Sequence, residues 1–468
     1  MNMDLVGSGL EIDVGAVVLD IGIEYTKVGF SKQPYPKHIL ETPFYIKDSI
    51  RSSDTIGTTL IAQVFKDKET LQNEIEEFLK DIFILKTQID AKNHTIVVCE
   101  QLIFPRAFMN ALGQVLFERY RVQGVYFFLA NVLPLYTTGL DTGIIVDSGF
   151  MHTSVSIVWQ TVFTIQGLKH EYMGAANLEH KVKQLLCEDN PEQHEKITTK
   201  AIKDVMCKWL RVLTRKQNTK FNETEENITK MKQKFYYLNV KQDRKEFTLK
   251  VSYYTMVNAA EIFFTHYERS ESQNMAWMVW DSILEAPNRI LVVQNLILSG
   301  GVFMIPGLKK RLIEEIHYAI ETIPKYSDLQ SIQKYIKVEK WIYPANCLVW
   351  IGASMLACLN QEIDTFLITC KEYIEEYECQ LPDRFGHWFL TCSRETEPEI
   401  EDKGEGEDAK EDRAIDDKFE TPVTKRPLNY FNKEFEQMNN TRKESLYLAV
   451  TPYSTRGVGR PTRFQFPK

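Results

Sequence analysis

The sequence lacks the features that would mark it as a membrane or secreted protein. It has no run of about 18 consecutive apolar residues, the length that a membrane-spanning helix needs. Residues 1–12 show neither the basic stretch nor the apolar stretch of a secretion signal. We therefore expect a soluble, intracellular protein without membrane insertion.

Metal-binding cysteine patterns are also missing. The eight cysteines are scattered through apolar or amphipathic segments, and no CxxC or Cys/His pair has the spacing of a zinc site. This distribution predicts reduced thiols that are mostly buried in the core.

A basic body of the kind that binds nucleic acid is absent. The net charge is −8, and residues 395–418 alone carry twelve acids against four bases. The last segment, 419–468, has nine bases against four acids. We expect an acidic linker and a basic, disordered tail over 393–468, a flexible N-terminus over 1–15, and no nucleic-acid partner. The alternative for the tail is that its basic, aromatic end binds an acidic partner.

One pattern of strand, aspartate, glycine turn and returning strand is present twice. It is seen in "VVLDIGIEYTKVGF" (17–30) and again in "GIIVDSGFMHTSVSIVW" (143–159), with amphipathic helical segments between the two copies. A hydrophobic content of 44% can supply a large core. The repetition predicts two related α/β halves with mostly parallel central sheets, whose two turns face each other across a cleft.

The pattern along the chain also predicts the division into segments. The first half covers 16–140 and includes a reduced outer subdomain at about 40–68. The second half covers 141–345, with a polar, peripheral insertion at 214–251. Residues 346–392 return to the first half, and the apolar "VWIGASMLACL" (349–359) within them predicts a strand followed by a helix.

A third glycine turn, "LSGGVFMIPG" (298–307), completes a pattern that is typical of a nucleotide site. Backbone N–H groups in glycine turns can hold phosphate oxygens, and two facing carboxylates can hold a hydrated Mg²⁺ ion. A further glycine turn lets the backbone approach an adenine ring. One such turn would be weak support, but three in this order predict a site.

These three turns resemble those of the actin family. The matching residues are Asp20, Gly22, Lys27, Gly29 and Phe30 in the first turn, Asp147, Ser148 and Gly149 in the second, and Ser299, Gly300, Gly301, Met304, Pro306 and Gly307 in the third. The resemblance implies the two duplicated halves around a nucleotide cleft that actin shares with hexokinase and Hsp70. It also implies that the matching positions contact a nucleotide, that Lys203 and Asp204 lie near the ribose, and that Asp20 and Asp147 hold a metal ion through water.

The departures from the family pattern fall where the chemistry would take place. Ile23 and Glu24 replace a serine and a glycine of the first turn, and Phe150 and Met151 replace an acid and a glycine of the second. The water-orienting glutamine of the family falls on Ala130. Without these groups we expect no catalytic residues and no ATP turnover, because phosphoryl transfer to water needs a positioned nucleophile.

Two interpretations of the cofactor are open at this point. ATP or ADP with Mg²⁺ is retained as a structural link between the halves and is not hydrolysed. Alternatively, the cofactor is absent, and the glycines and aspartates are kept only for the turns and hairpins themselves.

Within the family, the chain looks most like the divergent actin-related subunit of the dynactin pointed-end complex. That resemblance implies a capping subunit of the actin-related filament in dynactin, in contact with the other pointed-end subunits and indirectly with dynein and cargo adaptors. It implies a cytoplasmic, cytoskeletal location at microtubules and centrosomes, and the trimmed outer subdomain implies a chain that does not polymerise with itself. The alternatives are a nuclear actin-related protein of a chromatin-remodelling complex and a slow actin-fold ATPase.

Overall fold

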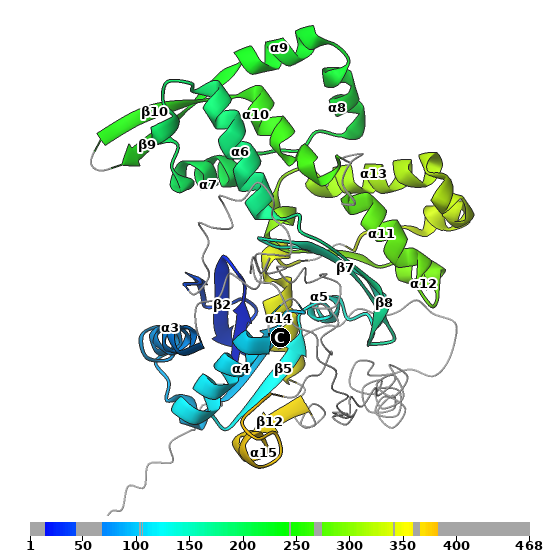
Figure 1. The fold of residues 1–468 in the computed structure, drawn as a ribbon. Helices are drawn as coiled ribbons and strands as arrows, with labels where there is room; N and C mark the ends of the chain where they lie inside the picture. Colours follow the sequence, from blue (N-terminus) through cyan, green and yellow to red (C-terminus); the bar gives the residue numbers. More distant parts are fainter. Residues whose placement is uncertain are drawn as a thin grey trace, which may run out of the picture. The chain divides into compact units, whose positions relative to one another are not determined.

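Two mixed β-sheets form the frame of the protein in a computed structural model (Figure 1). The structure describes residues 15–43, 68–102, 104, 106–242, 245–265, 274–339, 342–358 and 366–381, all within one compact unit. The N-terminal segment, most of the outer subdomain expected at about 40–68, and the tail expected at 393–468 lie outside these residues. None of the described helices combines the length and the apolar character that crossing a membrane requires.

The first sheet has six strands in the order β12-β5-β4-β1-β2-β3. Its strands are β1 (Val17–Ile21), β2 (Tyr25–Phe30), β3 (His38–Glu41), β4 (Thr95–Glu100), β5 (Gly124–Leu129) and β12 (Leu367–Thr369). Strands β1, β4 and β5 are parallel, whereas β2, β3 and β12 add antiparallel edges. Figure 1 shows β12 beside β5 at one edge, followed by the short helix α15 (Cys370–Glu375).

The second sheet repeats the arrangement of the first. Its strands are β6 (Gly143–Ser148), β7 (Thr153–Trp159), β8 (Val162–Glu171) and β11 (Leu296–Ser299), in the order β11-β6-β7-β8. In each half the first strand, β1 or β6, lies between its antiparallel hairpin partner and a later parallel strand, β4 or β11. The predicted duplication is therefore present. The prediction of mostly parallel sheets is wrong, because each half is built around a hairpin.

Both faces of the first sheet are covered, as the continuous apolar run of β4 predicts. Val17 and Leu19 of β1 point to one core, which α3 (Lys68–Lys80) and α4 (Arg106–Gln114) complete. Val18 points to the opposite core, where the indole of Trp350 donates a hydrogen bond to the Val18 carbonyl at 3.1 Å. The sheet is thus the middle of three layers.

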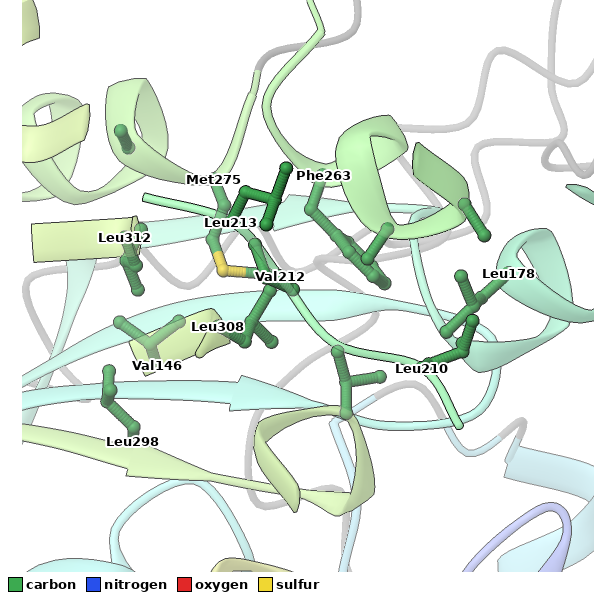
Figure 2. Close-up of a cluster of buried hydrophobic side chains, with 14 of the residues drawn as sticks. Val146, Leu178, Leu210, Val212, Leu213, Phe263, Met275, Leu298, Leu308 and Leu312 are labelled. Atoms are coloured by element: carbon green, nitrogen blue, oxygen red, sulfur yellow. The ribbon is translucent and has the colours of Figure 1, made fainter. Parts of the chain in front are cut away.

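The remaining helices mostly surround the second half. They are α5 (Leu133–Tyr136), α6 (Ala175–Asp189), α7 (Thr199–Lys208), α8 (Arg215–Asn222), α9 (Glu225–Gln233), α10 (Tyr253–Asn258), α11 (Met275–Leu284), α12 (Arg289–Val293), α13 (Leu308–Thr322) and α14 (Leu348–Leu356). Figure 2 shows how Val146 of β6, Leu298 of β11 and Leu308 of α13 meet in one apolar core. Leu178 of α6 lies in the same core, so helices and strands distant in sequence share it.

The segment expected as a strand and then a helix at 349–359 is helical from its start in α14. An apolar run that is buried on all sides has no period that separates strand from helix, so the sequence could not distinguish them. Leu348 packs in the core of the second sheet and Trp350 in that of the first. A Cβ on Gly352 would lie 2.0 Å from the Leu133 carbonyl oxygen, which shows how closely α14 approaches α5.

The polar segment 214–251 contributes to the core of the second half. It forms α8, α9 and the hairpin of β9 (Phe235–Gln242) and β10 (Lys245–Ser252). Leu238 and Val240 of β9 and Leu249 of β10 are buried in that core. The hairpin therefore has one buried face and one outer face, which explains the weak alternation of apolar and polar residues in its sequence.

The prediction that the cysteines are mostly buried is only partly right. Cys99 and Cys347 are buried, Cys207 is exposed, and four others, Cys187, Cys358, Cys370 and Cys379, are intermediate. Cys392 lies outside the described residues.

Candidate nucleotide site

The first turn carries a buried ion pair at its base. Asp20 of β1 lies opposite Lys27 of β2, and the Lys27 Nζ atom is 2.6 Å from the Asp20 Oδ2 atom. Burial alone would lower the pKa of Lys27, but the Asp20 carboxylate outweighs it and the pKa lies above its usual value. The negative charge of Asp20 is thus balanced by Lys27 on the same hairpin.

The tip of the first turn is closed by its own hydrogen bonds. The Gly22 N–H donates to the Tyr25 carbonyl at 3.2 Å, and the Thr42 N–H donates to the Glu24 carbonyl at 3.1 Å. The Thr42 hydroxyl also donates to the Gly22 carbonyl at 2.7 Å. Glu24 itself is buried, with 7% of its surface exposed. The carboxylate at this tip therefore points into protein and not into solvent.

The second turn has the same construction and is attached to α6. The Gly149 N–H donates to the His152 carbonyl at 2.9 Å. The Gly149 and Phe150 carbonyls accept from the N–H groups of Ala175 and Ala176 in the first turn of α6. These bonds satisfy helix N–H groups that would otherwise lack partners.

The third turn lies directly beside the second. Ser299 at the end of β11 is paired in register with Asp147 of β6. Gly300 has φ +100°, and a Cβ there would lie 2.1 Å from the Ser148 carbonyl oxygen. Gly301 has nothing within 4 Å of the corresponding position. Met304, at the end of this turn, has 52% of its surface exposed.

The charged groups of the first two turns are close enough to influence one another. Burial raises the pKa of Asp147 above its usual value, the Ser299 hydroxyl and Lys27 oppose this rise, and Asp20 adds to it. The structure therefore pairs Lys27 with Asp20, and the charges of both act on Asp147; the role of the three residues at a nucleotide remains a prediction. The pairing of β6 with β11 places Ser299 opposite Asp147 and Gly300 against Ser148. Gly149 and Gly301 are the next residues along the chain.

The two residues expected at a ribose are engaged with other side chains. The Lys203 Nζ atom on α7 is 2.5 Å from the Glu24 Oε1 atom of the first turn. Asp204 pairs with Lys208 one helical turn further on, at 2.6 Å. The role of Lys203 and Asp204 at a ribose remains a prediction, and the contacts seen here are protein contacts.

The residues of the first two turns do not fit the phosphates of ATP or a magnesium ion bound to them. The N–H groups of Gly22 and Gly149 are used within their own hairpins, and a carboxylate occupies the tip of the first turn. At the tip of the second turn lies the side chain of Met151, which is buried with 2% exposure. Among the residues that the structure describes, no group of three or more His, Cys, Asp or Glu side chains is placed to hold a metal ion. The open face at Gly301 is compatible with a flat ring.

The pairing of Glu24 with Lys203 could not be predicted from the sequence. The two residues are 179 positions apart, and a single sequence carries no signal for a contact at that range. The same holds for His152 and His170, whose rings stack at 4.9 Å between centroids beside the second turn. Neither residue stands in a pattern that indicates a role.

The histidine pair makes stability depend on pH. Burial lowers the pKa of His152 to about 4, and burial together with His152 lowers that of His170. A histidine kept neutral in the folded state takes up a proton first in the unfolded state, so stability falls as pH drops from about 6.5 towards 4. We expect His152 alone to contribute a loss of about 2 kcal/mol between pH 7 and pH 5.

Urea unfolding at pH 7, 6 and 5 measures this loss directly. The His152→Gln variant, which stays neutral, should lose less stability over the same range than the unaltered chain. Equal losses in both proteins would show that His152 does not carry the effect.

Two comparisons with known proteins agree with this arrangement. A family model described as Actin matches residues 11–380, which is most of the chain. Actin-related protein 10 of Dictyostelium discoideum is 25% identical over 410 residues, covering 77% of this chain and 86% of that protein.

Proposed function

This chain belongs to the actin family, and we propose that it acts there as a structural subunit and not as an ATPase. The observation that carries the proposal is the content of the two turn tips, where Glu24 and Met151 are buried at positions that the family pattern gives to glycine. The family match agrees with the predicted fold class, two duplicated α/β halves.

Ala130, which stands where the family has its catalytic glutamine, supports the same proposal. Ala130 has 3% of its surface exposed, and its N–H donates to the Glu100 carbonyl at 2.8 Å. A buried methyl group offers neither a donor nor an acceptor to orient a water molecule. Hydrolysis of a phosphoanhydride needs such a group, so this position gives no support to turnover.

The finer part of the proposal concerns the assembly. We propose that the chain caps the pointed end of the actin-like filament in dynactin, contacts the other pointed-end subunits and so supports dynein-driven transport in the cytoplasm. The similarity to a protein named actin-related protein 10 supports this choice, together with the degenerate turns. A subunit that does not depend on nucleotide turnover suits a permanent filament end.

Affinity purification of the full chain from cytosol tests the proposal. We expect stoichiometric recovery of dynactin subunits, no filaments from the isolated chain, and no measurable ATP turnover. Conventional actin, processed in parallel, provides the control for filament formation and hydrolysis. Co-purification with a chromatin-remodelling ATPase would favour the nuclear alternative, and turnover of about 1 s⁻¹ would favour an enzyme.

A further inference from the structure

The ion pair between Glu24 and Lys203 connects the two halves of the chain. Glu24 lies in the turn between β1 and β2 of the first half, and Lys203 lies on α7 of the second. Their side chains are 8% and 26% exposed, and the charged atoms are 2.5 Å apart. A pair this sheltered is screened far less than one at the surface.

Lys203 meets the first half through more than one group. Its ammonium donates to the Tyr25 hydroxyl at 3.4 Å and lies 5.4 Å from the centre of the Tyr25 ring. The Glu41 carboxylate is a further 3.9 Å neighbour. One cation of the second half is therefore surrounded by a carboxylate, a phenol and a second carboxylate of the first.

The turn that carries Glu24 is fixed by hydrogen bonds within the first half, independently of Lys203. Its backbone is bonded to Thr42, and the Thr42 hydroxyl also lies 2.8 Å from that of Thr26. A carboxylate on a fixed turn loses little conformational freedom when it pairs, which favours the pair.

Apolar side chains join the halves beside the ion pair. Met151 of the second turn and Ala176 of α6 are buried in the core cluster of the first half, and Ile23 and Phe150 pack against that cluster. All four come from the two turn tips or from the helix that the second turn caps. An apolar contact thus lies at the two turns that, by the resemblance to the actin family, would hold phosphate.

We infer that this chain holds its two halves together with a clasp of its own residues, in which the Glu24 carboxylate is the anion that Lys203 binds. We define the clasp as Glu24, Tyr25, Glu41 and Lys203, with the apolar contact of Ile23, Phe150, Met151 and Ala176 beside it. The inference goes beyond the proposed function, because it concerns the isolated chain and holds whether or not the chain joins a filament.

A built-in anion changes how the halves respond to nucleotide. A ligand shifts the balance between open and closed states only by its different affinity for the two. Here Lys203 already has an anionic partner, and an added nucleotide would have to compete with Glu24 for it. The halves are therefore closed without ligand, and Mg²⁺ with ATP adds no stability.

Charge reversal tests the clasp in the full chain. We expect Glu24→Lys and Lys203→Glu each to lower the Tm by roughly 4 °C and to speed hydrogen exchange in β2 and α7. The double variant, Glu24→Lys with Lys203→Glu, should recover most of the Tm and the exchange protection. Asp204→Asn, which removes a pair within α7, serves as the control and should change the Tm by about 1 °C or less.

Each result of these experiments either supports the clasp or contradicts it. Recovery in the double variant, together with a Tm of the unaltered chain that Mg²⁺–ATP does not raise, supports the clasp. Additive losses in the double variant would overturn it, and so would a Tm of the unaltered chain that rises with Mg²⁺–ATP. None of these results depends on filament partners, so failure of the clasp and failure of the proposed function can be told apart.

Discussion

Replacing Arg311 with alanine is expected to lower the free energy of unfolding by roughly 3–5 kcal/mol, the usual effect of leaving a buried charge without its partner. Arg311 on α13 is 4% exposed and donates to both carboxylate oxygens of Glu261, at 3.0 and 2.9 Å. It also donates to Glu315 at 2.7 Å and to the Leu213 carbonyl at 3.1 Å.

The loss should extend beyond the immediate site. Arg215 at the start of α8 contacts Glu315 at 2.8 Å, and its N–H donates to Glu314 at 2.6 Å. The network around Arg311 therefore ties the chain that enters α8 to α13. Without it, the start of segment 214–251 loses one of its polar attachments to the rest of the second half.

Urea unfolding of Arg311→Ala measures the effect, with Lys230→Ala as a matched control. Lys230 forms an exposed pair with Glu226 one helical turn away, and its loss should cost about 0.5 kcal/mol or less. Arg311→Ala combined with Glu261→Gln should regain part of the stability, because one of the stranded carboxylates is then neutral. A loss in Arg311→Ala no larger than that of Lys230→Ala would contradict this account of the network.

Replacing Gly300 with alanine is the second large effect that we expect, again a loss of roughly 3–5 kcal/mol. Its backbone has φ +100° and ψ 163°, a conformation that is essentially restricted to glycine. The new Cβ would meet the Ser148 carbonyl oxygen at 2.1 Å, so β11 and β6 would have to separate at their ends. The Gly300 N–H, which donates to the Ala345 carbonyl at 2.9 Å, would move with them.

The neighbouring glycine provides the control. A Cβ on Gly301 meets nothing within 4 Å, so Gly301→Ala should change the stability by less than about 1 kcal/mol. Unfolding of both variants in urea gives the comparison. Equal losses would mean that the general cost of replacing a glycine, and not the contact with Ser148, determines the result.

Much of the fold can be predicted from the sequence, because duplicated patterns are local. The two hairpins with Asp20 and Asp147 and the continuous apolar strand β4 each follow from a spacing within a few residues. Where local pattern is ambiguous, prediction fails. The start of α14 is apolar on every side, so its sequence does not separate helix from strand. Its helical form is seen in its contacts with both sheets and in the close approach of Gly352 to Leu133.

The candidate site shows a different limit. The positions of Asp20, Lys27 and Asp147 are predictable because the family pattern places them, and the departures at Glu24 and Met151 are visible in the sequence. What those departures do is not visible, because it depends on partners far along the chain. Glu24 forms an ion pair with Lys203, and Met151 packs in the core of the first half.

These contacts suggest how an actin-type fold can serve as a fixed part of an assembly. For such a fold, the resemblance to the actin family implies a nucleotide held between the two halves. In the clasp that we infer, side chains from both turn tips form the bridge, and the inference is that this bridge does not depend on a ligand. A chain closed in this way presents one constant surface to its neighbours.

The nucleotide content of the purified chain tests this central claim most directly. The chain would be isolated without added nucleotide, denatured, and its supernatant separated by ion-exchange chromatography, with conventional actin as the positive control. The account predicts far less than one nucleotide per chain from protein that is fully folded before denaturation. One tightly held ATP or ADP per chain would contradict it.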